Sequence, residues 1–261
     1  MRSRIQGMID TVLFDIGGTL ITQTHSPQRS LLYSVYVKHL LAEIGIAVTE
    51  SDQAFYERIH DNAESYKHLG ETTGKELDPV TIWKDFILKD YKISEDNIRM
   101  IADNLSFTFD YIRMYNNPRE NLKETLEQLK NMGMKLGIIT NTISTSFADH
   151  ILREYGVSDY FPVIVKSCEF GRRKPDRSIF DHTMELIGST RETTCYVGDT
   201  ISRDVLGSRN AELAMVIKIK NNSISHRDKA FQGTDAPKAD FDIDNLIEIP
   251  EIIKTFNEER T

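Results

Sequence analysis

The sequence lacks any long apolar run: no hydrophobic stretch approaches the roughly 18 residues that a membrane-crossing helix needs. Residues 1–4 are not followed by an apolar stretch, so no signal peptide is expected. Cysteine is scarce as well, since only Cys168 and Cys195 are present, in separate apolar or mixed stretches. This usage favours two buried free thiols in a reducing compartment over a disulfide or a metal pair. We expect a cytoplasmic protein that does not enter a membrane.

An excess of basic residues is also missing. The chain has 32 Lys and Arg against 40 Asp and Glu, which gives a formal net charge of −8. Because binding to nucleic acid requires a basic surface, this balance argues against a nucleic-acid partner. Clustered acids favour the binding of cations instead. The 261 residues suit either one large domain or a core with a medium-sized insertion.

Short apolar runs alternate with amphipathic helical patterns through most of the chain. Strands are expected at residues 11–14, 135–139, 163–165, 194–197, 214–219 and 241–243. Continuous apolar runs of this length are typical of strands that are buried on both faces. The pattern therefore predicts an α/β fold with a doubly wound, Rossmann-like parallel sheet.

The stretch between the first two of these strands shows no strand pattern. Residues 22–26 are polar, and Pro27 can occupy the first turn of a helix. Apolar residues then recur at helical spacing over residues 28–41, 52–67, 81–88 and 94–107. We therefore predict a helical domain at residues 24–110, inserted into a core made of residues 1–23 and 111–261.

Polar side chains follow the ends of the expected strands, where ligands bind in an open α/β sheet. They are Asp15, Thr140 with Asn141, and Asp199 with Asp204, and Lys174 lies in the loop after a fourth strand. The three carboxylates would repel one another in a shared crevice unless a cation lay between them. Their hard oxygen atoms suit Mg²⁺. Lys174 and the hydroxyl of Thr140 can then hold a phosphate dianion while Asp15 attacks phosphorus in line and forms an aspartyl phosphate.

Four segments in this order closely resemble the motifs of the haloacid dehalogenase (HAD) superfamily, which is dominated by Mg²⁺-dependent phosphatases. They are residues 15–19 (Asp-Ile-Gly-Gly-Thr), Thr140 after its apolar run, residues 174–176 (Lys-Pro-Asp) and residues 198–204 (Gly-Asp-Thr-Ile-Ser-Arg-Asp). The resemblance covers about residues 8–23 and 115–250. It implies that Asp15 is the nucleophile and that Lys174 is the catalytic lysine.

The resemblance also implies where the metal and the phosphate bind. Mg²⁺ would be held by the carboxylates of Asp15 and Asp199 and by the backbone carbonyl of Gly17. Asp204 would either bind the ion directly or contact a group that binds it. The residues implied for the substrate phosphate are Gly18, Thr19, Thr140, Asn141 and Lys174. The helical insertion resembles the first type of cap domain (C1) in the family. Members with this cap usually act on small phosphorylated metabolites, because the cap closes over the crevice and excludes water.

Gly17 departs from the pattern of the family, in which most phosphatases carry an acid at this position. That acid protonates the leaving group and then activates water, and losing such a group typically costs about 10²–10⁴-fold in rate. We therefore expect a Mg²⁺-dependent hydrolase that works through phospho-Asp15 and favours good leaving groups.

Two alternatives remain beside this hypothesis. One is a protein that binds phosphate or a phosphorylated metabolite with little turnover. The other is a phosphonate-cleaving hydrolase, in which a cap lysine forms a Schiff base and Lys38 is the nearest candidate. A metal-free haloalkanoate dehalogenase is disfavoured, because residues 198–199 (Gly-Asp) match the metal-binding form of the fourth motif.

Overall fold

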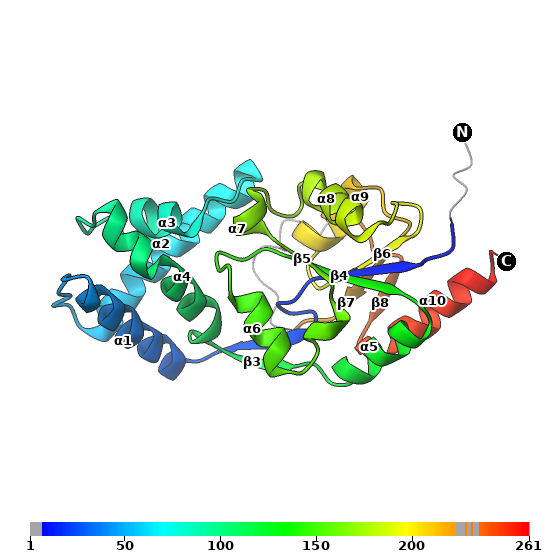
Figure 1. Cartoon of the computed structure of the whole chain (residues 1–261), viewed down its shortest axis with the longest axis horizontal. Helices are drawn as coiled ribbons and strands as arrows, with labels where there is room; N and C mark the ends of the chain where they lie inside the picture. The colour runs from blue at the N-terminus through cyan, green and yellow to red at the C-terminus, as the bar shows by residue number, and fades with distance from the viewer. Residues whose placement is uncertain (1–6, 223–227, 229–230, 232–234, 261) are drawn as a thin grey trace.

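The computed structural model describes residues 7–222, 228, 231 and 235–260, and its centre is a six-stranded parallel sheet (Figure 1). The strand order is β5 (Val163–Lys166), β4 (Lys135–Thr140), β1 (Thr11–Phe14), β6 (Thr194–Gly198), β7 (Met215–Ile219) and β8 (Phe241–Ile243). The chain runs from β1 toward β5 on one side and from β6 toward β8 on the other. The order therefore reverses beside β1, where open α/β sheets bind their ligands.

Both faces of this sheet are covered, as the apolar strands predict. Val12 and Phe14 of β1 face one apolar cluster, and Leu13 faces the other. The first cluster includes residues of α5 (Leu122–Asn131), α6 (Phe147–Glu154) and α10 (Ile249–Glu258). The second is covered by α8 (Arg177–Ile187), with α9 (Leu206–Asn210) beside it. The predicted doubly wound fold is confirmed.

The helical insertion has an apolar core of its own, at one end of the molecule (Figure 1). Its elements are α1 (Pro27–Glu43), α2 (Asp52–Thr73), α3 (Pro79–Thr81), the π-helical η1 (Ile82–Ile87) and α4 (Glu95–Tyr111). Side chains of Ser26, Ser51 and Ser94 cap α1, α2 and α4 by accepting a backbone N–H at 3.2 Å. Such caps satisfy amides that have no partner within a helix. Trp83 is fully buried among these helices.

A two-stranded antiparallel sheet links the insertion to the core and was not expected from the sequence. It pairs β2 (Ile21–His25) with β3 (Met114–Pro118), in register from Ile21 with Pro118 to His25 with Met114. The residues of β2 after Ile21 are polar, and all but the half-buried Gln23 are exposed, so they carry no apolar strand pattern. The chain thus leaves the core and returns to it along one paired ribbon.

The remaining elements are short. They are η2 (Ser158–Tyr160), α7 (Ser167–Phe170), the π-helical η3 (Ile201–Val205) and η5 (Leu246–Glu248). Within the described residues, no helix combines the length and the apolarity needed to cross a membrane.

Candidate active site

Three carboxylates meet at the carboxyl ends of β1 and β6. Asp15 follows β1 and Asp199 follows β6, while Asp204 lies in η3 just beyond. The backbone N–H of Asp15 donates to the carbonyl of Val197 at 3.0 Å, which joins the ends of the two strands. One oxygen from each carboxylate lies within 4.8 Å of the others, and all three residues are buried. The structure therefore brings together the acids that the sequence singled out.

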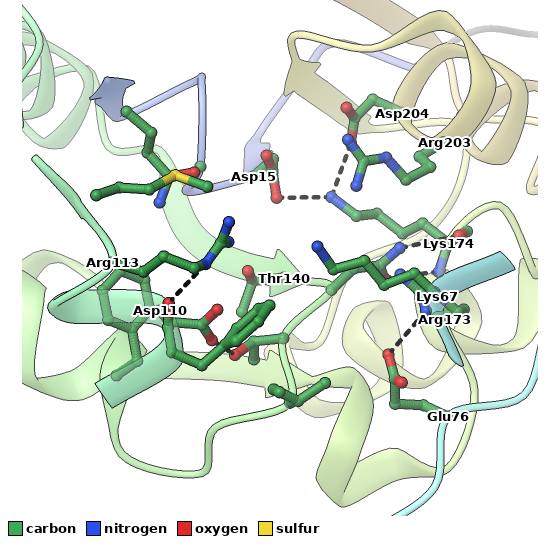
Figure 2. Close-up of a pocket in the computed structure, with 18 residues that line it drawn as sticks. Asp15, Lys67, Glu76, Asp110, Arg113, Thr140, Arg173, Lys174, Arg203 and Asp204 are labelled. Carbon is green, nitrogen blue, oxygen red and sulfur yellow. Dashed lines mark hydrogen bonds and ion pairs between the residues drawn. The ribbon is translucent and has the colours of Figure 1, made fainter. Parts of the chain in front are cut away.

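Lys174 connects two of these carboxylates. Its Nζ atom donates to Oδ1 of Asp15 at 2.8 Å and to Oδ1 of Asp204 at 2.7 Å (Figure 2). It also donates to the hydroxyl of Tyr196 at 2.7 Å, a partner in β6 that sequence analysis missed. Burial alone would lower the pKa of Lys174, but the two carboxylates outweigh it and raise the pKa. The lysine is therefore a fixed positive charge beside Asp15.

The side chain of Asn141 positions the backbone of this lysine. Its Oδ1 atom accepts from the N–H of Lys174, and its Nδ2 atom donates to the carbonyl of Lys174, both at 2.9 Å. One hydrogen of the amide remains for a ligand, so the implied contact of Asn141 with phosphate stays a prediction. Thr140, at the end of β4, is buried and lines the same cavity as Asp15.

Asp204 is fully engaged by protein donors. Oδ1 accepts from Lys174 and from the hydroxyl of Tyr196 at 3.1 Å, and Oδ2 accepts from the N–H of Thr200 at 3.0 Å. Burial would raise its pKa, but Lys174 and Arg203 outweigh that effect and hold the pKa at about 2. Asp204 is therefore an anion that orients Lys174, and a direct contact with a metal would compete with bonds it already makes.

Asp199 has a free acceptor in the site. Its Oδ2 atom accepts from Nδ2 of Asn221 at 2.7 Å, but its buried Oδ1 atom has no hydrogen-bond partner within the described part of the chain. Burial, together with the nearby Asp204 and Asp15, raises the pKa of Asp199 to about 7. An unpaired buried carboxylate oxygen beside two further carboxylates is an environment that a hard divalent cation fits.

The two glycines of the first motif differ in their surroundings. Gly18 has φ +89°, and a β-carbon there would lie 2.1 Å from Oδ2 of Asp199, so no larger residue fits. Gly17 lines the cavity, and the nearest atom to a β-carbon on it would be Oε1 of Gln23 at 2.8 Å. Thr19 is fully buried and does not line the cavity. Its hydroxyl has no hydrogen-bond partner among the described residues. Its predicted contact with phosphate stays a prediction.

A cavity of about 170 Å³ lies between the core and the insertion (Figure 2). On the core side it is lined by Asp15, Gly17, Thr140, Asn141, Lys174 and Asp204, whereas Asp199, Gly18 and Thr19 lie outside the lining. The lining residues that sequence analysis did not connect with the site are Gln23, Lys67, Glu76, Phe109, Asp110, Arg113, Met114, Thr142, Ile143, Phe147, Arg173 and Arg203. Lys38, by contrast, lies outside the lining, because its Nζ atom donates to the carbonyl of Glu50 and to Oδ1 of Asp52. Lys38, named only as the candidate for the phosphonate-cleaving alternative, is therefore a helix lysine that pairs with its neighbours, and Lys67 is the lysine of the insertion that lines the cavity.

The insertion is docked against the core beside this cavity. The N–H of Glu76 donates to the carbonyl of Gly171, and the N–H of Arg173 donates to the carbonyl of Gly74, both at 3.1 Å. The carboxylate of Glu76 is buried, accepts from the hydroxyl of Ser167 at 2.8 Å and lies 3.5 Å from Nη1 of Arg173. Arg173 therefore joins the insertion to the core. The contacts hold the insertion over the strand ends.

Comparison with known proteins identifies the class. A family model for haloacid dehalogenase-like hydrolases matches residues 9–212, so the chain belongs to this family and is a hydrolase of HAD type. The resemblance found in the sequence is thereby confirmed.

Two curated relatives and one solved structure illustrate this similarity. The chain is 24% identical to a glyceraldehyde 3-phosphate phosphatase of Methanopyrus kandleri over 248 residues, 95% of this chain and 98% of that protein. It is 28% identical to a phosphoglycolate phosphatase of Aquifex aeolicus over 218 residues, 81% and 87% of the two chains. A crystal structure of a HAD phosphatase from Thermococcus onnurineus shares the fold, with a TM-score of 0.59, 24% identity and coverage of 94% and 98%.

Proposed function

We propose that this chain is a Mg²⁺-dependent phosphatase that hydrolyses small phosphorylated metabolites through a phospho-Asp15 intermediate. The observation that carries the proposal is the pairing of a buried nucleophile with a fixed cation, since Nζ of Lys174 lies 2.8 Å from Oδ1 of Asp15. The names of the two curated relatives support a small phosphate ester as substrate. The buried free thiols Cys168 and Cys195 favour the cytoplasm as its compartment.

The metal would be held by the carboxylates of Asp15 and Asp199 and the backbone carbonyl of Gly17. When bound, Mg²⁺ would offset the charge shared by the carboxylates and the phosphate. Asp204 would act by orienting Lys174, because its own oxygen atoms already accept hydrogen bonds.

In the first step, a carboxylate oxygen of Asp15 attacks phosphorus and the bond to the leaving oxygen breaks, which leaves an aspartyl phosphate. Lys174 donates to the nucleophile and stabilises negative charge on the transferred group. The hydroxyl of Thr140, which lines the cavity, would donate to a phosphate oxygen. In the second step, water attacks phosphorus and the bond between phosphorus and the Asp15 oxygen breaks. The carboxylate of Asp15 is thereby restored, and the protons of the water leave with inorganic phosphate.

The substrate range follows from Gly17. Glycine has no side chain to protonate a leaving oxygen, and the amide of Gln23, which lies over it, does not titrate near neutral pH. We therefore propose that acyl and aryl phosphates, whose leaving groups need no proton, are turned over faster than alkyl phosphates. Residues 24–110 would serve as a C1-type cap that closes over the bound substrate.

A panel of acyl, aryl and alkyl phosphates, assayed with and without Mg²⁺, tests this proposal. The matched control is Asp15→Asn, which keeps the shape of the nucleophile and removes its charge. Hydrolysis that requires both Asp15 and Mg²⁺ supports the phosphatase. Ligand binding that depends on Mg²⁺ with no hydrolysis of any ester would support the alternative of a binding protein.

A further inference from the structure

Arg113, just after α4, is a buried cation without a counter-ion in the cavity. Only 6% of the residue is exposed. Its Nε atom donates to the carbonyl of Phe109 at 3.2 Å. Its two terminal nitrogen atoms donate no hydrogen bond to any residue in the described part of the chain. Figure 2 shows the guanidinium pointing into the cavity, toward the space in front of Asp15. A buried group with several unused donors costs free energy unless a ligand accepts from them.

A second cation from the insertion lies beside it. Cζ of Arg113 is 4.1 Å from the centre of the Phe109 ring, and Nζ of Lys67 is 5.0 Å from the same centre. Lys67 also pairs with Glu64 at 2.6 Å on α2. Two positive charges that share one aromatic ring in a half-enclosed space repel each other, and an anion bound between them would remove that repulsion.

The carboxylates of the cavity have other partners. Oδ2 of Asp110 accepts from the hydroxyl of Thr142 at 2.6 Å, and Asp110 forms no ion pair with Arg113 or Lys67 among the described residues. Burial raises the pKa of Asp110, while its hydrogen bond from Thr142 and the positive charges of Arg113 and Lys67 act in the opposite direction. Glu76 accepts from the hydroxyl of Tyr66 at 2.5 Å in addition to its contacts with the core. Lys174 engages the remaining two carboxylates of the lining, so no carboxylate of the lining forms an ion pair with Arg113 among the described residues.

We propose that Arg113, assisted by Lys67, binds a second anionic group of the substrate, a carboxylate or a second phosphate, at the end away from the phosphate that Asp15 attacks. The two terminal nitrogen atoms of a guanidinium match two oxygen atoms of such a group. A cavity of about 170 Å³ leaves room for only a short carbon chain between the two anions. This inference rests on the proposed phosphatase and narrows its substrates to small dianionic or polyanionic esters.

The test compares substrates that differ in the second anion alone. One pair is phosphoglycolate and ethylene glycol monophosphate, in which a hydroxymethyl group replaces the carboxylate. The other pair is 1,3-propanediol bisphosphate and 1,3-propanediol monophosphate. We expect the wild type to prefer the substrate with the second anion in at least one pair, and the pair that shows the preference identifies that anion as a carboxylate or a phosphate.

The variants are Arg113→Gln and, as a matched control, Arg99→Gln, which removes an exposed arginine from α4. Arg113→Gln is expected to reduce the preference in kcat/KM by about 10- to 100-fold, mainly through KM, because one charged hydrogen-bonding partner is lost. Arg99→Gln should keep the wild-type preference. Arg113→Lys retains the positive charge but lacks the two terminal nitrogen atoms of the guanidinium, so it should give an intermediate preference. This variant replaces Arg113→Gln in the test if the glutamine variant does not fold.

An unchanged preference in both Arg113 variants, or no preference in the wild type for either pair, would overturn the inference. If the wild type hydrolyses no ester at all, the proposed function fails. The same four compounds are then titrated calorimetrically into Asp15→Asn with and without Arg113→Gln. Tighter binding of the compound with the second anion, lost in the double variant, would support the subsite on its own, and equal binding would refute it.

Discussion

A β-carbon on Gly17 would lie 2.8 Å from Oε1 of Gln23, so the place of the usual acid/base is overlaid by a neutral amide. Gln23 comes from β2, and its Nε2 atom donates to Oδ1 of Asn116 at 2.9 Å, in the paired strand β3. The β2–β3 ribbon that connects the insertion to the core therefore also covers the position that an acid side chain at residue 17 would occupy. This relationship leads to the first prediction.

Gly17→Asp should increase kcat for alkyl phosphates more than for acyl phosphates. The clashing atom is the far end of a flexible side chain, so Gln23 can move aside at small cost. The gain is bounded by the contribution of about 10²–10⁴-fold that a positioned acid/base makes. Gly17→Asn, of the same shape but unable to transfer a proton, is the control. Equal rates for the Asp and Asn variants on alkyl phosphates would contradict the missing-acid account.

Replacing Lys174 should damage both stability and turnover. Lys174→Met leaves the carboxylates of Asp15 and Asp204 buried without their shared cation, which costs about 3–5 kcal/mol in the free energy of unfolding. Chemical denaturation measures this loss. Adding Asp204→Asn should recover part of the stability and none of the activity. Recovery of activity in that double variant would show that Lys174 serves only to neutralise charge.

Addition of Mg²⁺ should raise the melting temperature of the protein. Binding of Mg²⁺ relieves the repulsion among the three carboxylates. A free Mg²⁺ concentration of about 100 times the Kd adds about 2.7 kcal/mol to the free energy of unfolding. Asp199→Asn should remove most of the shift, because Oδ1 of Asp199 is the buried acceptor without a partner among the described residues. Asp181→Asn, at a half-exposed position on α8, is the control and should keep the shift. A full shift in Asp199→Asn would place the ion elsewhere.

Two histidines should contribute a loss in the free energy of unfolding as the pH falls below about 6.5. This loss opposes the contribution of Asp199, whose pKa of about 7 lets the folded chain take up a proton before the unfolded chain does. His25 and His60 both stack on Tyr56, with ring centres 6.5 and 5.4 Å from its ring. Burial, with a further contribution from Arg113, lowers the pKa of both from 6.5. The unfolded chain therefore takes up protons first, so stability is lost from pH 6.5 down to the lowered pKa values and no further below them.

Urea denaturation at pH 8 and pH 5.5 measures this loss. His60→Gln, which cannot take up a proton, should lose less stability between the two pH values than the wild type does. The value at pH 8, where the histidines are neutral in both states, corrects for any change in packing. An identical loss in the variant and the wild type would exclude His60 as a source of the pH dependence.

Much of the fold and part of the site could be predicted from the sequence. The apolar runs at residues 11–14 and 194–197 identify two neighbouring strands, and their parallel pairing brings Asp15 and Asp199 together. Strand β2 was missed, because its polar residues show no apolar alternation. Its side chain Gln23 was missed with it, since nothing local indicates that residue 23 folds back over residue 17.

The sequence by itself determined the sheet, the acids at its strand ends and the lysine that pairs with them, because each belongs to a short local pattern. Only the tertiary structure decided that Arg113 and Lys67 face the cavity and that Lys38 does not. Residues 38, 67 and 113 lie in or beside helices whose exposed faces all carry charge. Which of these faces meets Asp15 is set by how α2 and α4 pack and where Glu76 docks on the core, and those contacts join residues that are far apart in the chain.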